Sequence, residues 1–163
     1  MSRPSVTTAG ILIGAGLGGF VDGIVLHQIL QWHNMLSSRV PPLDLVHMKY
    51  NMVWDGLFHA LTWIMTATGL ALLWRAGAAP ADERPWSSRR FGGALLFGWG
   101  TFNVVEGVID HTLLRVHHVH PGLHEQAWDL GFLGFGVVLA LIGSWLTGAL
   151  VRGGASAVVR RPD

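Results

Sequence analysis

The sequence has no cysteine and few charged residues. The absence of Cys among 163 residues excludes disulfides, thiolate metal sites and cysteine nucleophiles. Asp, Glu, Lys and Arg make up 13% of the chain, against about 25% in a typical soluble domain. The formal net charge is +1, so no basic surface predicts nucleic-acid binding. Half of the residues are hydrophobic, and the 22 Gly and 8 Trp are typical of membrane-spanning helices and their interfacial ends.

Four apolar stretches are each long enough to cross a hydrocarbon core, which takes about 20 helical residues. They predict an all-α integral membrane protein, a four-helix bundle that forms a single domain over residues 1–163. The helices are expected near 9–35, 50–74, 91–116 and 127–151. The Gly/Ala/Arg-rich segment 152–163 is predicted to be a flexible tail.

The positions of Lys and Arg predict the orientation, because cytoplasmic segments carry the excess of these residues. One group lies at the N-terminus, in the second connection or in the tail, and a smaller group lies around the first and third connections. The larger group is Arg3, Arg75, Arg84, Arg89, Arg90, Arg152, Arg160 and Arg161, and the smaller is Arg39, Lys49 and Arg115. We therefore expect a multi-pass protein of the bacterial cytoplasmic (inner) membrane. Both termini would be cytoplasmic, and the first and third connections would face outside.

The chain also resembles itself. The segment 20–27 matches 104–111, since both contain an acidic residue, Gly, three further residues and His. Trp54-Asp55 matches Trp128-Asp129 further along. These matches predict two tandem helical-hairpin repeats, at about 9–74 and 91–151, related by an axis along the membrane normal. The alternative is chance similarity between apolar segments, which the shared polar elements disfavour.

Eight ionisable side chains interrupt the apolar stretches. A charge at mid-bilayer costs roughly 2.5–3.5 kcal/mol on insertion scales, so these groups must face one another, a metal or water. They are Asp22, Asp55, Glu106, Asp110 and Asp129, with His27, His59 and His111.

Counting residues from the helix ends places these groups in two layers of the outer half of the bilayer. The outer layer would pair His27 with Asp55, and His111 and Asp110 with Asp129. The inner layer would contain Asp22, His59 and Glu106. Asp22 and His27 are five residues apart, or roughly 140° around an α-helix. Both are therefore expected at the edges of the inward face; the alternative is that one of them supports a ligand from the side by a hydrogen bond.

Carboxylates on all four helices and His on three predict a metal site with His27, Asp55, His111 and Asp129 as first candidates. The inventory resembles that of di-iron carboxylate bundles, although their Glu-x-x-His spacing is absent. Nitrogen and oxygen ligands suit Fe, Cu, Zn or Mn. Haem would need two facing His such as His27 and His111, and the five nearby carboxylates disfavour it. A metal-free hydrogen-bonded network is the plainer alternative.

A second set of His lies at the expected outer surface and is an alternative metal site, whether it feeds the buried site or is the main one. A solvated polar loop is the simpler interpretation of any single member. The set is His33, His47, His117, His118, His120 and His124.

The acidic-Gly-x-x-x-His and Trp-Asp-Gly-x-x-His elements, at Asp22 to His27 and Trp54 to His59, give the chain a resemblance to a known family. This is a family of predicted four-helix bacterial membrane proteins, a domain of unknown function, and the resemblance covers roughly residues 9–151. It implies a small multi-spanning membrane protein and carries no activity, substrate or ligand set.

The sequence thus predicts a metal-binding membrane protein whose site, with one ion or two, serves redox chemistry or metal handling. If it is an enzyme, it would be a metal-dependent membrane oxidoreductase. A proton or ion conductor with a buried Asp/Glu/His relay is an alternative, and so is an accessory subunit of a respiratory membrane complex. Expected partners are the lipid bilayer and another membrane or respiratory-chain protein, and a homodimer around a shared site is an alternative arrangement.

Overall fold

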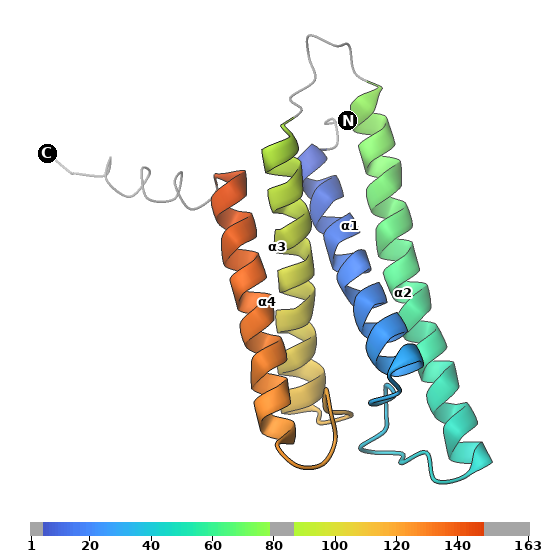
Figure 1. The fold of residues 1–163 in the computed structure, drawn as a ribbon. Coiled ribbons are helices and arrows are strands. Elements are labelled where there is room, and N and C mark those ends of the chain that lie inside the picture. Colours follow the sequence, from blue (N-terminus) through green and yellow to red (C-terminus); the bar gives the residue numbers. More distant parts are fainter. Residues whose placement is uncertain (1–4, 79–86, 149–163) are drawn as a thin grey trace, which may run out of the picture.

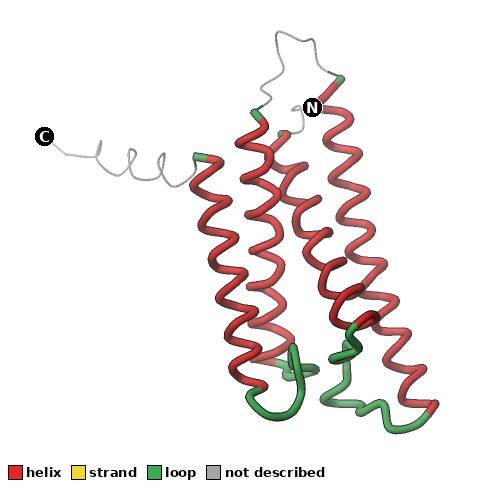
Figure 2. Tube along the Cα trace, viewed as in Figure 1, coloured by secondary structure: helices red, strands yellow, loops and turns green. Residues whose placement is uncertain are grey.

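The computed structural model describes residues 5–78 and 87–148, and every regular element in them is helical. Four helical segments run up and down the molecule (Figures 1 and 2). In chain order they are α1 (Val6–Val21) with the π-helix η1 (Asp22–Ile29), α2 (Leu45–Gly77), α3 (Ser88–Glu106) with the π-helix η3 (Gly107–Leu113), and α4 (Glu125–Thr147). The predicted all-α fold is confirmed. The predicted tail 152–163 lies outside the described residues.

The first and third helical segments end earlier than the apolar pattern predicts. They stop at Ile29 and Leu113 rather than near residues 35 and 116. Just beyond, Gln31 and Arg115 adopt left-handed backbone, with φ of 52° and 49°, and this turns the chain out of the helical direction. Apolar residues such as Trp32, Met35 and Val116 follow these turns, so hydropathy alone extends the helices too far.

The second helix begins earlier than predicted, at Leu45 rather than near residue 50. Asp44 precedes it in extended backbone, and its Oδ1 accepts hydrogen bonds from the backbone amides of Val46 and His47, at 2.8 and 3.0 Å. A side-chain cap of this kind satisfies amides that have no partner within the helix.

The helices pack in the order α2, α1, α3, α4, with α1 and α3 in the centre (Figure 1). Each of the three neighbouring pairs in this row is in extensive contact, whereas α2 and α4 lie at opposite ends of it. The described helices therefore form an open row rather than a bundle closed between its first and last members. The two parallel helices α1 and α3 form its core.

Glycine allows α1 and α3 to approach closely. A Cβ on Gly14 would lie 2.0 Å from the carbonyl oxygen of Leu95, and one on Gly98 would lie 2.0 Å from that of Ile11. The two contacts are reciprocal, because each helix places a glycine against the backbone of the other. Small residues have this role in membrane helix pairs, where backbone contact replaces the hydrophobic effect as the source of association.

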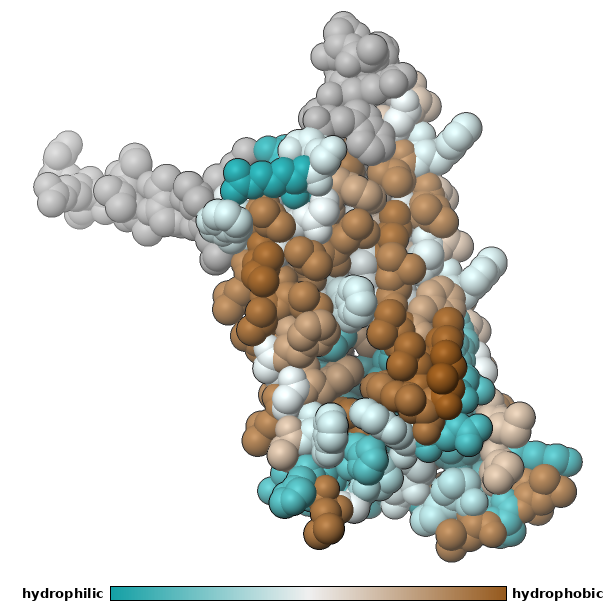
Figure 3. Space-filling model, viewed as in Figure 1, coloured by the Kyte–Doolittle hydropathy of each residue, from teal (hydrophilic) through white to brown (hydrophobic). Residues whose placement is uncertain are grey.

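Three of the helical segments are long and apolar enough to cross a membrane: Val6–Ile29, Leu45–Gly77 and Glu125–Thr147. Among the described residues, the segment containing α3 is not, because several Gly and the polar Asn103 and Glu106 interrupt its apolar character. Both polar side chains are buried between neighbouring helices. Figure 3 shows apolar side chains over the flanks of the helices, with a smaller hydrophilic group at the upper end and a larger one at the lower end.

The lower end, with the larger hydrophilic group, holds the connections 30–44 and 114–124 (Figures 2 and 3). The start of α1 and the end of α4 lie together at the opposite end (Figure 1). The connections contact each other, since the backbone amide of Ser38 donates to the carbonyl of Val116 at 2.9 Å. The Arg39 guanidinium also donates to the carbonyl of Leu114 at 2.6 Å. The two connections thus form one cover over the ends of α1 and α3.

We expect Gly98→Ala to lower the free energy of unfolding by about 1–3 kcal/mol, the usual cost of overpacking, because α1 and α3 must move apart. Thermal unfolding in mild detergent would measure the change. Gly92→Ala in the same helix is the control, because a Cβ there meets nothing within 4 Å. Equal melting temperatures for the two variants would contradict the proposed role of the α1–α3 contact.

Candidate metal centre

The π-helical turns at the ends of α1 and α3 bring acidic residues and His onto one face. A π-helix is wider than an α-helix and bonds residue i to i+5, so residues five apart lie one above the other. The Nε2 atom of His27 is accordingly 3.1 Å from Oδ2 of Asp22. The separation of roughly 140° expected for an α-helix is therefore wrong here. The same turn in η3 places His111 over Glu106.

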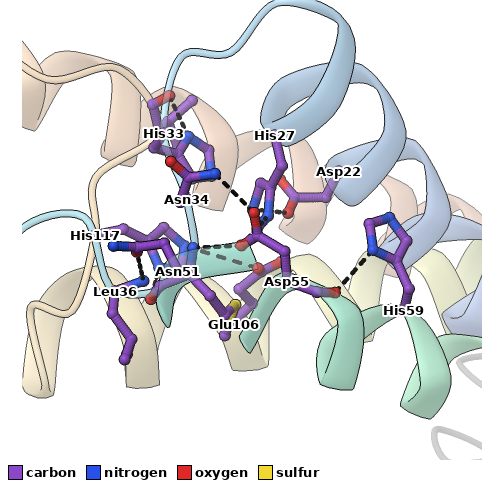
Figure 4. Close-up of polar contacts among 12 residues, drawn as sticks. Asp22, His27, His33, Asn34, Leu36, Asn51, Asp55, His59, Glu106 and His117 are labelled. Carbon is purple, nitrogen blue, oxygen red and sulfur yellow. Dashed lines mark hydrogen bonds and ion pairs between the residues drawn. The ribbon is translucent and has the colours of Figure 1, made fainter. Parts of the chain in front are cut away.

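The two connections then return a second pair of His into the interior. His33 is 4% exposed and His117 is fully buried. Their rings stack with centroids 4.6 Å apart and planes 6° from parallel. Sequence analysis places both in an alternative set at the outer surface, but the structure brings them to the buried ends of α1 and α3. Figure 4 shows this convergence with His27 and Glu106.

The outward nitrogens of these two imidazoles fix their tautomers. Nδ1 of His33 donates to the carbonyl of Val119 at 2.8 Å, and Nδ1 of His117 donates to the carbonyl of Met35 at 3.1 Å. A carbonyl can only accept, so Nδ1 carries the proton and Nε2 carries a lone pair. Burial, with His27 as a further cause, lowers the pKa of His33 to about 4. Burial also lowers the pKa of His117 well below its usual range. Both rings are therefore neutral at pH 7.

Asp55 holds the outward side of His27. Its Oδ1 lies 3.2 Å from Nδ1 of His27 and accepts from the backbone amide of Met35 at 2.8 Å, while Oδ2 accepts from Nδ2 of Asn34 at 2.7 Å (Figure 4). The contact predicted between His27 and Asp55 is thus present. Both oxygens of Asp55 already have partners, so this carboxylate orients the imidazole and the connection beside it.

Asp129 makes the matching contacts in the second half of the chain. Its Oδ1 accepts from the backbone amide of Val119 at 2.9 Å and lies 3.6 Å from Nδ1 of His111. Its Oδ2 accepts from Nδ1 of His118 at 2.6 Å. Asn34 and Met35 in the first half therefore correspond to His118 and Val119 in the second. Sequence analysis missed Asn34, and its only sequence signal is its position one residue after His33, which matches that of His118 after His117.

The inward atoms of the cluster meet in one buried volume. Ligand atoms of His27, His33 and His117 lie within 4.8 Å of one another, and those of Glu106, His111 and His117 do so as well. All six side chains that converge have an inward nitrogen or oxygen atom without a hydrogen-bond partner: Asp22, His27, His33, Glu106, His111 and His117. The Oδ2 atom of Asp22 lies 3.1 Å from Nε2 of His27, which is close enough for a hydrogen bond, but the angles at this contact are not those of one.

This arrangement is an acceptor site without a matching donor. Nε2 of His117 faces Oε1 of Glu106 at 3.9 Å, and neither atom has a hydrogen-bond partner. Burying a carboxylate without compensation is costly. A cation between the acceptors would provide that compensation, and the donor set of imidazole nitrogens and carboxylate oxygens is one that first-row transition metals accept.

The remaining predicted ligands lie outside this volume. Nδ1 of His59 donates to the Asp55 carbonyl of its own helix at 2.8 Å, so His59 is not the partner of Asp22 that depth counting suggested. Asp110 is half-buried, and its carboxylate has no hydrogen bond or ion pair among the described residues. The other His of the predicted outer-surface set lie apart from one another. His47 pairs with Asp44 at the surface, and His118 donates a hydrogen bond to Asp129. His120 packs against Trp32 and Trp128, and His124 is exposed just before α4.

Comparison with known proteins identifies the chain at family level. No curated protein and no solved structure matches it. Residues 9–149 match the family described as "Predicted membrane protein (DUF2243)", which agrees with the three helical segments apolar enough to span a bilayer. The match covers nearly all of the described chain, including both π-helical turns and both connections, and the chain belongs to this family.

Proposed function

We propose that this membrane protein holds a transition-metal centre where α1, α3 and the two connections meet. The observation that carries the proposal is the convergence of buried lone pairs without donors. The proposed ligands come from both halves of the chain: Asp22, His27 and His33 from the first, Glu106, His111 and His117 from the second. Asp55 and Asp129 would orient ligands by holding their outward nitrogens, as carboxylates commonly do beside metal-bound His.

The distances suit a metal ion. Bonds from an ion such as Zn²⁺ to imidazole nitrogen or carboxylate oxygen are about 2.0–2.2 Å. Two ligand atoms on one ion therefore lie up to roughly 4.2 Å apart, and the 3.9 Å between His117 and Glu106 fits that limit. Two carboxylates and neutral imidazoles also balance the charge of a divalent ion. Fe, Cu, Zn and Mn all accept such ligands.

The packing of the imidazoles supports an ion rather than haem. The ring centroids of His27 and His33 are 4.5 Å apart, and those of His111 and His117 are 4.7 Å apart. Rings at these separations are in contact, so the imidazoles themselves fill the space between His27 and His111. A porphyrin between these two residues would have to displace the others.

Burial supports a resident centre rather than a labile one. Each of the six proposed ligands is at most 4% exposed. A protein that passes metal to others needs ligands that solvent or a partner can reach. A sealed centre is better suited to redox chemistry, in which a bound Fe or Cu ion would supply one-electron transfer. The chain's own residues would hold the ion, keep both carboxylates ionised beside it and exclude bulk water.

The alternative of a proton or ion conductor receives less support. A relay across the bilayer needs titratable or polar groups along its whole length. Beyond the cluster, α1 contains no ionisable residue from Val6 to Val21, and α4 contains none from Leu130 to Thr147. The respiratory-complex partner and the homodimer stay predictions.

We also propose that the two halves are tandem repeats with both termini cytoplasmic. The matched contacts of His33 with His117, and of Asp55 with Asp129, support the repeat. The start of α1 and the end of α4 lie at the same end of the molecule, which supports an even number of membrane crossings (Figure 1). With the distribution of Lys and Arg, the metal centre would lie towards the outer face of a bacterial inner membrane.

We expect protein purified in mild detergent, or reconstituted with Fe, Cu, Zn or Mn, to contain bound metal in stoichiometric amount by elemental analysis. His117→Ala should reduce the bound metal to about a tenth or less, since losing even a residue that supports a ligand typically costs 10–100-fold in affinity. His47→Ala, which removes an exposed His at the same end, should retain it. Native protein without metal after every reconstitution would overturn the proposal.

Removing metal with a chelator should lower the melting temperature of the native protein. A ligand that binds only the folded state stabilises it by about 4 kcal/mol at a thousand times its dissociation constant. The variant Asp22→Asn/Glu106→Gln, which removes both buried charges, should not respond to chelator and should melt no lower than the chelated native protein. Scanning fluorimetry in detergent would measure all four states. A native melting curve that the chelator leaves unchanged would contradict a stabilising metal.

A further inference from the structure

A pocket opens beside the proposed centre in the second half of the chain, next to the contact between His111 and Asp129. It has a volume of about 320 Å³ and lies between η3, the following connection and the start of α4. His111 forms part of its wall, together with Arg115, His118, Glu125 and Asp129. It is therefore a polar pocket that reaches one of the six buried groups from the end of the molecule where the connections lie.

His111 is the group through which the pocket and the buried volume communicate. It is 2% exposed, and neither of its ring nitrogens has a hydrogen-bond partner. Its Nδ1 lies 3.6 Å from Asp129, whereas the matching contact of His27 with Asp55 is a hydrogen bond of 3.2 Å. His111 is thus held less firmly than its counterpart, and it borders both spaces.

The first half of the chain closes the corresponding place. Asn51 lies one helical turn before Asp55 and is fully buried. Its side chain accepts from the amide of Leu36 at 3.1 Å and donates to the carbonyl of Val40 at 2.7 Å, which pins the connection over the helix. The residue at the same distance before Asp129 is Glu125, which lines the pocket instead.

We propose that this pocket is the entry site through which a divalent transition-metal ion reaches the centre. The inference rests on the proposed function, because a sealed centre needs a loading route. Glu125 has no ion pair among the described residues and would attract a hydrated cation at the mouth. Asp129, His118 and then His111 offer oxygen and nitrogen atoms that can replace its water stepwise. Movement of the His111 ring would pass the ion to Glu106 and His117.

Because the mouth of the pocket carries charges of opposite sign, removing each one should change the loading rate in the opposite direction. Glu125 attracts a cation and Arg115 repels it, and charges near an entrance act mainly on association rates. With Co²⁺ as the probe, stopped-flow absorption would follow loading of metal-free protein in detergent at low salt. We expect Glu125→Gln to slow loading about fivefold and Arg115→Gln to accelerate it about fivefold, an effect that high salt should reduce. The final amount bound should be unchanged in both.

Two controls separate charge from damage to the fold. Gln already occupies the left-handed position 31 that matches Arg115, so Arg115→Gln preserves the turn. The double variant Glu125→Gln/Gln126→Glu returns a carboxylate to the neighbouring lining position and should restore fast loading. Native rates in both single variants, or slowing in both, would overturn the entry site while the metal centre stands. A native protein that never takes up Co²⁺ would instead overturn the centre itself.

Discussion

The burial of Asp22 and Glu106 without hydrogen-bond donors is the constraint on which the rest of this structure depends. Removing an ionised carboxylate from water costs several kcal/mol unless the protein compensates for it. The imidazoles of His33 and His117 do not donate to these acids, because their N–H groups point outward to backbone carbonyls. These two imidazoles therefore direct lone pairs, rather than protons, into the volume that holds both acids, and only His27, 3.1 Å from Asp22, lies where it could provide a proton. That arrangement is unfavourable for a structural polar network, whose purpose is to match donors with acceptors. It is the arrangement that a cation requires.

The backbone is organised to create this volume. Gly14 and Gly98 let α1 and α3 come into backbone contact, which places the ends of these two parallel helices side by side. The change from α- to π-helix then aligns Asp22 with His27 within one wide turn. Without the π-helical turn, side chains five residues apart would point in different directions, and the acid and the imidazole could not share a site. Such turns are costly in regular helices and occur often at functional sites, which agrees with their presence in both halves at the same place.

The sequence was sufficient for the helices and for part of the cluster. Hydropathy predicted four helical segments, and residue depth predicted that His27 meets Asp55 and that His111 meets Asp129, because both inferences need only the rise of a helix. The inclusion of His33 and His117 could not be predicted in this way. Their position depends on left-handed turns at Gln31 and Arg115, residues that give no sequence signal for positive φ. Asp55 was one of the four first candidates for a ligand, yet its oxygens accept hydrogen bonds from Asn34 and Met35. The depth of a residue in the membrane does not reveal which groups its side chain contacts.

The differences between the two halves carry as much functional meaning as their likeness. Matched contacts build a nearly symmetric set of proposed ligands, but Asn51 holds the connection over the helix in the first half, whereas Glu125 lines a pocket in the second. A purely structural duplication gives no reason to keep one side open, because an unfilled polar pocket beside a buried His reduces packing without providing a hydrogen bond. A metal centre would give a reason. Burial that retains an ion also slows its entry, so one side of the site would have to open to solvent. The weaker hold on His111, at 3.6 Å from Asp129, lies beside the pocket, where this proposed ligand would have to move for an ion to pass.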